Sequence, residues 1–362
     1  MAVVADEVLR VHHLLLLLLG VDMTEATDAH NKSFGSSVVS PGFNTIDSRS
    51  TAAHDTPSAR PARRLGARAN VVSSYFTAVS AGYRDNPYHN RYHGTDVLQS
   101  CSVMLHQDKL ARLLEPEHKL ALLIAAAVHD FKHPGVSNKF LTTTGSDEAI
   151  TWNDMSVLEN MHVSEAFRLM RTEELDLFAF VERDTRLLLR KLIIELVLAT
   201  DLALSFKYVS NMKHATDQDP GLEKEDTATA VMCMVLKCCD VGHPSKPLPL
   251  HLQWTTRITE EFFKQGDRER ELGLAVSPLC DRGDVNLPKA QLGFIDFVVL
   301  PQYRPMAAFL ETDEFLRRVA DNRAYWEAEA KKPTQSPPTT YVAVGAAGGA
   351  AGGGAGGGAG GG

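Results

Sequence analysis

The spacing of apolar residues between positions 70 and 330 constrains the fold of this chain more than any other feature. Apolar side chains return there every three or four residues, as on helices with one buried face. Proline and glycine clusters such as His133-Pro134-Gly135 separate the runs, and strand-like alternation is nearly absent. The sequence therefore predicts an all-α fold, a compact multi-helix bundle. The runs are Val71–Val79, Val97–Leu105, Leu120–Val128, Val163–Met170, Leu187–Leu198, Thr227–Cys238 and Trp254–Phe263.

The segments outside this body differ from it in composition. Residues 1–20 contain six consecutive leucines, Leu14–Leu19, and are interpreted as a possible short buried helix, because the run is far shorter than the roughly 20 apolar residues of a membrane span. The segment also lacks the basic start of a signal peptide. Residues 21–69 are predicted to be a low-complexity linker or disordered. Residues 331–362 are predicted to be a disordered tail, first proline-rich and then rich in glycine and alanine.

Charge and cysteine content narrow the class of protein. The net charge of −8 gives no electrostatic reason to expect nucleic-acid binding. An anionic substrate would therefore need local compensation, for example from bound metal ions. The five cysteines are odd in number and include no CxxC pair, which argues against a disulfide framework. We accordingly expect an intracellular, cytoplasmic protein without a transmembrane segment.

Histidine and aspartate residues recur near the ends of the predicted helices. His93 follows a Tyr-His-Asn motif, His129 and Asp130 close an alanine-rich apolar run, and Asp240 ends a later one. A buried His-Asp pair needs a partner, and a metal ion is one solution: imidazole and carboxylate suit zinc, while carboxylate and water suit magnesium or manganese. Each residue taken alone is more often an ordinary core or surface residue. The order H…HD…D on successive helices, however, is shared with helical metal-dependent phosphohydrolases.

Six longer stretches are specific enough to indicate a family. They are NPYHNRYHGTDVLQS (86–100), AAAVHDFKHPGVSNKFL (125–141), NDMSVLENMH (153–162), VLATD (197–201), WTTRITEEFFKQGDRERELGLAVSPLCDR (254–282) and QLGFIDFVVLPQY (291–303). Through them the chain resembles, from about Val71 to Trp326, the catalytic domain of the class I cyclic-nucleotide phosphodiesterases. The resemblance implies an HD-type phosphohydrolase bundle over residues 70–330, with a two-metal site at the bottom of a deep pocket. It also implies hydrolysis of cAMP or cGMP to the 5′-monophosphate, which ends cyclic-nucleotide signalling.

The resemblance assigns a role to each matching position. His93, His129, Asp130 and Asp240 would hold zinc, and Asp130 would also contact magnesium or manganese. His89 falls at the general acid, which protonates the leaving O3′ after in-line attack by a hydroxide that bridges the metals. His133, Glu159 and His162 would order the waters of magnesium. The substrate pocket would contain Gln291 at the purine edge, Phe294 and Ile258 on the two base faces, and Tyr88, Leu202, Val241 and His243.

Three positions depart from the family pattern. Lys132 stands where an acidic residue is usual, and its cation either weakens magnesium binding or extends to solvent. Met161 replaces the first of two adjacent histidines, while His162 keeps the second. His243 stands where cAMP-selective members tend to carry asparagine; together with LGLAVSPLCDR it resembles the calmodulin-stimulated, dual-specificity subfamily.

Several alternatives stay open from the sequence. The family domain begins with several helices before the Tyr-His-Asn motif, and only residues 71–83 match clearly here, so the fold is either shortened or completed by a homodimer or regulatory partner. The chain is alternatively a catalytically impaired regulator that binds cyclic nucleotides or a partner. A third interpretation, an HD-type phosphohydrolase with another nucleotide substrate, is disfavoured by Gln291, Phe294 and residues 254–282.

Overall fold

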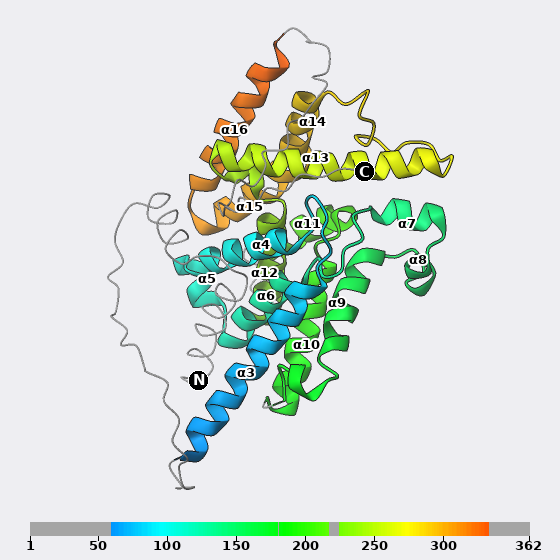
Figure 1. Cartoon of the computed structure of the whole chain (residues 1–362). Helices are drawn as coiled ribbons and strands as arrows, with labels where there is room; N and C mark the ends of the chain where they lie inside the picture. The colour runs from blue at the N-terminus through cyan, green and yellow to red at the C-terminus, as the bar shows by residue number, and fades with distance from the viewer. Residues whose placement is uncertain (1–58, 180, 217–223, 333–362) are drawn as a thin grey trace, which may run out of the picture.

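The computed structural model describes residues 59–179, 181–216 and 224–332 (Figure 1). These residues form helices joined by turns and loops, and no strand occurs among them. The predicted all-α bundle is therefore confirmed. Each predicted apolar run lies within one helix to within a residue.

The helices follow one another with short connections. In the first part of the described chain they are α3 (Ala59–Gly82), α4 (Arg91–Leu105), α5 (Asp108–Leu113), α6 (Pro116–Val128), α7 (Asn138–Thr144), α8 (Asp147–Thr151), α9 (Val157–Leu169), η1 (Glu173–Leu175) and α10 (Arg183–Leu198). The second part contains η2 (Leu202–Leu204), α11 (Ser205–Thr216), α12 (Lys224–Asp240), η3 (His243–Ser245), α13 (Leu248–Glu271), α14 (Leu287–Phe294), the π-helix η4 (Ile295–Val299), α15 (Leu300–Leu310) and α16 (Glu314–Ala330).

Helices α6 and α12 form the centre of the core. Residues 121–128 of α6 and residues 231–236 of α12 are almost completely buried. Helices α4 and α10 pack against both of them. A helix that is apolar on most of its surface has to be covered on all sides, which explains the central position of α6 and α12.

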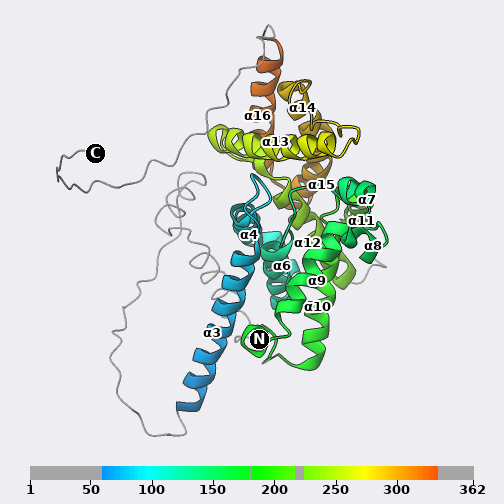
Figure 2. The ribbon, with the colours of Figure 1, turned by 45° about the vertical axis from the view of Figure 1, so that its right-hand side comes forward.

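Two groups of helices extend from this centre in opposite directions. Helices α3, α9 and α10 run toward one end of the molecule, and α13 to α16 gather at the other end, with α13 lying across the bundle (Figures 1 and 2). This arrangement leaves the ends of α4, α6 and α12 between the two groups.

The N-terminal boundary of the helical body differs from the prediction. Helix α3 begins at Ala59, so residues 59–69 are helical and the expected linker over 21–69 is wrong for them. The segment contains no apolar run, but alanine and arginine are strong helix formers, and Pro61 lies in the first turn, where proline is tolerated. The expectations for residues 1–20, 21–58 and 333–362 lie outside the described residues.

Two further findings concern the whole described part. All five cysteines are free and buried. Among the described helices, none combines the length and the hydropathy that a membrane span requires.

Candidate metal centre and substrate pocket

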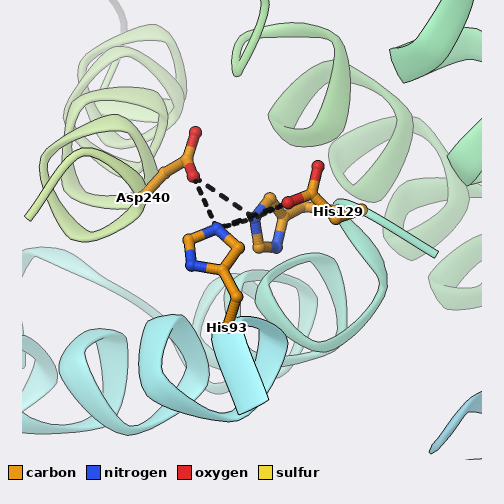
Figure 3. A group of neighbouring side chains, drawn as sticks. His93, His129 and Asp240 are labelled. Carbon is orange, nitrogen blue, oxygen red and sulfur yellow. Dashed lines mark hydrogen bonds and ion pairs between the residues drawn. The ribbon is translucent and has the colours of Figure 1, made fainter. Parts of the chain in front are cut away.

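Three helix ends bring the predicted metal ligands together (Figure 3). His93 lies in the first turn of α4, which Asn90 caps by accepting hydrogen bonds from the backbone N–H groups of Tyr92 and His93. His129 is the residue that ends α6, and Asp130 follows it. Asp240 is the last residue of α12. The four polar side chains thus stand at or beside helix ends, and these ends meet at one buried place.

The four side chains form a compact cluster. His93 Nε2 lies 3.1 Å from Asp240 Oδ1 and 3.3 Å from Asp130 Oδ2. His129 Nε2 lies 3.2 Å from Asp130 Oδ2 and 3.4 Å from Asp240 Oδ1. One ligand atom from each of the four residues lies within 4.8 Å of the others. His93, His129, Asp130 and Asp240 therefore have the arrangement of a ligand set for one ion.

The chemistry of this cluster fits a divalent cation. Asp130 Oδ2 is buried and forms no hydrogen bond of acceptable geometry, and its nearest polar neighbours are the two imidazole Nε2 atoms at 3.2 and 3.3 Å. A buried carboxylate beside two imidazoles is stabilised when a cation lies among them. His129 Nδ1 lies 2.9 Å from the carbonyl oxygen of Ala126 and so donates its proton there, which leaves Nε2 as the ring nitrogen that faces the cluster. Burial favours the protonated form of Asp240, but the two imidazoles outweigh it and lower the pKa of this carboxyl. Two imidazoles and two carboxylates are a donor set that suits zinc.

A second group of polar side chains surrounds Asp130. His162 Nδ1 donates to the carbonyl of Phe131 at 2.7 Å, and its Nε2 lies 3.7 Å from Asp130 Oδ1. The rings of His133 and His162 are stacked with centroids 5.4 Å apart. Burial lowers the pKa of His162 to about 4 and that of His133 well below its ordinary value, so both rings are neutral.

Glu159 completes this group from helix α9. It is buried, and Asn138 Nδ2 donates to its Oε2 at 3.0 Å. Burial raises the pKa of Glu159 to about 7. The ionised form of such a buried carboxyl would be stabilised by a hydrated cation close by.

His89 is held by a carboxylate that we did not predict. Its Nδ1 forms a short contact with Glu261 Oε1 on α13. Glu261 Oε2 accepts the backbone N–H groups of Tyr88 at 2.8 Å and His89 at 3.0 Å. The imidazole also stacks on His133, with ring centroids 4.0 Å apart. Glu261 therefore fixes both the backbone and the ring of His89.

The protonation of His89 follows from these neighbours. Burial alone would lower the pKa of His89, but Glu261, and next Asp130, raise it to about 9. Cations at Asp130 and Asp240 would cancel their share of this effect, whereas the contribution of Glu261 would stay. Without bound cations, His89 is thus a protonated imidazole at neutral pH.

The seven predicted substrate-binding residues line one pocket of about 230 Å³. Tyr88 and Asp240 lie on its wall, so the pocket extends outward from the cluster of candidate ligands. Pocket residues without a predicted role include Phe262, Leu279 and Leu287. The predicted residues brought together there are Tyr88, Leu202, Val241, His243, Ile258, Gln291 and Phe294.

The polar groups of this pocket are oriented by buried neighbours. Thr255 Oγ1 donates to Gln291 Oε1 at 3.4 Å, which leaves the Gln291 amide N–H groups for other acceptors. His243 stacks on Phe294 with centroids 5.4 Å apart and an interplanar angle of 13°. His251 holds His243 through an Nδ1 to Nδ1 contact of 2.9 Å.

Two positions that depart from the family pattern have simple structural explanations. Lys132 has a left-handed backbone (φ 63°), and its Nζ lies 2.6 Å from Glu165 Oε2. The Lys132 side chain is 40% exposed, so its charge is directed to an ion pair at the surface and not to the four candidate ligands. Met161 is buried in a small apolar cluster with Val157 and Leu158.

Comparisons with known proteins find similarity to cyclic-nucleotide phosphodiesterases. The family model described as 3′5′-cyclic nucleotide phosphodiesterase matches residues 88–319. The chain is 42% identical over 233 residues to the probable 3′,5′-cyclic phosphodiesterase pde-1 of Caenorhabditis elegans, covering 64% of this chain and 34% of the relative. It is 43% identical over 234 residues to the dual specificity calcium/calmodulin-dependent 3′,5′-cyclic nucleotide phosphodiesterase 1B of Cricetulus griseus, covering 64% and 43%.

A relative whose name specifies cyclic AMP is also similar. The 3′,5′-cyclic-AMP phosphodiesterase 4C of Mus musculus is 37% identical over 270 residues, a match that covers 72% of this chain and 39% of the relative. The chain therefore spans less than half of the length of each of these three relatives.

Proposed function

Because the chain belongs to the 3′,5′-cyclic nucleotide phosphodiesterase family, we propose that it hydrolyses the cyclic phosphate of cAMP, cGMP or both to the 5′-monophosphate. The observation that carries this proposal is the buried carboxylate oxygen of Asp130. It lies 3.2 and 3.3 Å from two imidazole Nε2 atoms without forming a hydrogen bond of acceptable geometry, and it belongs to the ligand cluster that lies beside a pocket lined by His89, Gln291 and Phe294. The biological role would be to end a cyclic-nucleotide signal, in the cytoplasm.

The ligand cluster would hold the metal ions of the reaction. His93, His129, Asp130 and Asp240 would bind zinc, and Asp130 would also contact a magnesium or manganese ion whose waters His133, Glu159 and His162 orient. When bound, two such ions neutralise phosphate charge and lower the pKa of water to near neutrality. The protein residues supply the position of the substrate and the proton for the leaving group.

His89 would supply that proton. Because its Nδ1 contacts Glu261, its Nε2 is the atom free to donate to the departing O3′ of the ribose. Phe294 and Ile258 would hold the purine between them, and Gln291 would bind its edge. The base would thereby fix the distance between His89 and the cyclic phosphate.

The direct test is hydrolysis of cAMP and cGMP by the purified full chain with added Mg²⁺, before and after chelation. We expect the 5′-monophosphate as product and loss of turnover after chelation, because chelation removes the ions that would activate water. Metal retention without turnover of either nucleotide would instead support a regulator that binds without catalysis. Turnover of non-cyclic nucleotides alone would support a broader HD-type phosphohydrolase.

The Glu261→Gln variant is expected to shift the pH profile of the enzyme. Activity requires protonated His89 and is lost as the pH rises through the pKa of this residue, which Glu261 raises toward 9. Without the carboxylate the pKa falls, so the alkaline limb of kcat/KM should move down by about 1 pH unit or more. The matched control is Glu260→Gln, since Glu260 pairs with Arg282 at the surface. A profile identical in all three proteins would remove Glu261 from this role.

His243 is proposed to influence the choice between the two nucleotides. Trp326 Nε1 donates to His251 Nε2 at 2.6 Å, and burial lowers the pKa of His251 to about 4, so this neutral ring carries its proton on Nδ1. That proton is donated to His243 Nδ1. The proton of His243 therefore lies on Nε2, as a hydrogen-bond donor at the base pocket.

The Nε2 proton would be donated to O6 of guanine, where adenine carries an amino group, which is itself a donor. The shorter side chain of the His243→Asn variant would not hold a donor at that position, so the cGMP-to-cAMP ratio of kcat/KM should fall. One hydrogen bond of about 1 to 1.5 kcal/mol corresponds to a change of about 5- to 12-fold. The exposed residue His106 provides the control His106→Asn. An unaltered ratio would show that His243 is neutral toward the base.

A further inference from the structure

A second cavity lies behind the substrate pocket, and its contacts are not used by the proposed reaction. It measures about 240 Å³, similar to the substrate pocket, and we refer to it as the back cavity. Helices α4, α12, α15 and α16 and the start of α13 form its walls. Its apolar lining consists chiefly of Val103, Met104, Leu250, Met306 and Phe315.

The two cavities share one wall, the end of α12 and the turn that follows it. Asp240, Val241 and His243 face the substrate pocket, while Cys238, Cys239, Gly242 and Ser245 line the back cavity. This wall is held from behind, because Tyr303 Oη donates to the carbonyl of Cys238 at 2.8 Å. Whatever fills the back cavity therefore contacts the segment that carries a proposed metal ligand.

The charges around the back cavity favour an uncharged occupant. Lys246 Nζ is neutralised by Asp96 Oδ1 at 2.8 Å. Glu314 and Arg318 add one further charge of each sign. A cavity with an apolar floor and no net charge attracts neither an anion nor a cation. Apolar side chains that fill it would remove its lining from water, which stabilises the folded protein.

An apolar segment of the sequence lies before the first described helix. Leu14–Leu19 is a run of six leucines without any charge, and it lies outside the described residues. Six adjacent leucines left in water would be strongly unfavourable. Residues 20–58 connect the run to α3 and could extend over more than ~100 Å, several times the ~36 Å length of that helix.

We propose that the leucine run Leu14–Leu19 docks into the back cavity of the same chain. The run is uncharged and apolar, as the cavity requires, and the connecting segment is long enough to reach it. Docked there, the leucines support the shared wall from behind and stabilise the positions of Asp240 and His243. The interaction surface thus lies opposite the substrate pocket, and its occupant is an N-terminal segment of the protein itself.

An added thiol on the cavity wall provides the test. Leu250 lines the cavity and is 45% exposed in the described body; Leu272 is 54% exposed and lies outside the cavity. We compare maleimide labelling of the full-length Leu250→Cys and Leu272→Cys variants by mass spectrometry. If the leucine run covers the cavity, the thiol at position 250 reacts at least about tenfold more slowly, although the two exposures are similar.

The source of the protection is identified by a second change. Adding Leu16→Asp and Leu17→Asp should remove the difference between the two thiols, whereas the control Ser36→Asp with Ser37→Asp adds the same charge and should preserve it. Equal labelling of positions 250 and 272 in the parent proteins would overturn the proposal. Protection that survives the Leu16→Asp, Leu17→Asp change would also overturn it.

A cross-link keeps the test independent of the aspartate variants. In a Leu16→Cys, Leu250→Cys protein, a short bis-maleimide should join the two positions within one chain. Cross-links between two chains would instead assign the cavity to a second copy, and no cross-link at all would leave the run elsewhere; both results contradict the proposal. None of these readouts depends on turnover, so they are separate from the test of the proposed function.

Discussion

The Asp240→Ala variant is expected to lose the proposed zinc ion and to lower kcat for the proposed cyclic-nucleotide hydrolysis by about 10³-fold or more. Asp240 Oδ1 is the atom nearest to His93 Nε2 in the cluster, at 3.1 Å, and it is supplied by a different helix from the other three ligands. Removing its carboxylate leaves three candidate ligands and none from helix α12. Elemental analysis for zinc, together with turnover of the better nucleotide, measures both effects.

Thermal unfolding separates loss of metal from loss of fold. A ligand that binds only the folded state raises Tm, so added zinc should stabilise the metal-stripped native protein and should not stabilise metal-stripped Asp240→Ala. The control is Asp321→Ala, which removes an exposed carboxylate of α16 and should behave as the native protein. Full zinc retention by Asp240→Ala would show that the ion is held without helix α12.

The fold was predictable because its helices carry their own pattern. The apolar run Leu120–Val128 is almost continuous, and the structure places it at the centre, where a helix is covered on all sides. The first turns of α3 were not predictable in this way. Residues 59–69 have helix-forming composition without an apolar stripe, and the periodicity that indicates a packed helix is absent there.

The ligand cluster was predictable for a related reason. His129 and Asp130 interrupt an apolar helix at its end, and the cost of burying such a pair indicates a partner from the order of residues alone. Glu261 gave no such signal. It stands beside Glu260 on a helix rich in charged residues, and only the three-dimensional fold shows that Glu261 is buried against His89 while Glu260 pairs with Arg282 at the surface.

The base pocket depends on contacts that a sequence does not encode locally. His251 reaches His243 from the first turns of α13, and Trp326 reaches His251 from α16. The π-helix η4 follows Gln291 and Phe294 directly. Pro301 lacks the N–H that an α-helix would direct to the carbonyl of Phe297, which accounts for the irregular turn at this point. The α-helical spacing of 3.6 residues per turn therefore does not hold through Ile295–Val299.

The second large effect is expected for His89→Gln, which should lower kcat by about 10²–10⁴-fold and leave the zinc content unchanged. His89 is not among the four clustered ligands, and its Nδ1 is occupied by Glu261. Glutamine retains a hydrogen-bond donor but cannot transfer a proton at neutral pH. The leaving O3′ would then have to take its proton from water.

A matched change outside the pocket controls for the loss of a histidine. His106 Nδ1 lies 2.8 Å from the carbonyl of Ser102 at the end of α4, so His106→Gln should change neither metal content nor turnover. The structural readout is thermal stability, which should remain similar in both variants with zinc bound.

The pH profile distinguishes proton transfer from mere positioning. In the native protein, the activity should fall as the pH rises through the pKa of His89. The His89→Gln variant has no group to deprotonate there, so its residual activity should be flat or rise with hydroxide. A substrate with a better leaving group than a ribose alkoxide needs no proton, and His89→Gln should therefore recover most of its deficit on such a substrate. A deficit that is equally large with both leaving groups would mean that His89 positions the phosphate and that another donor protonates O3′.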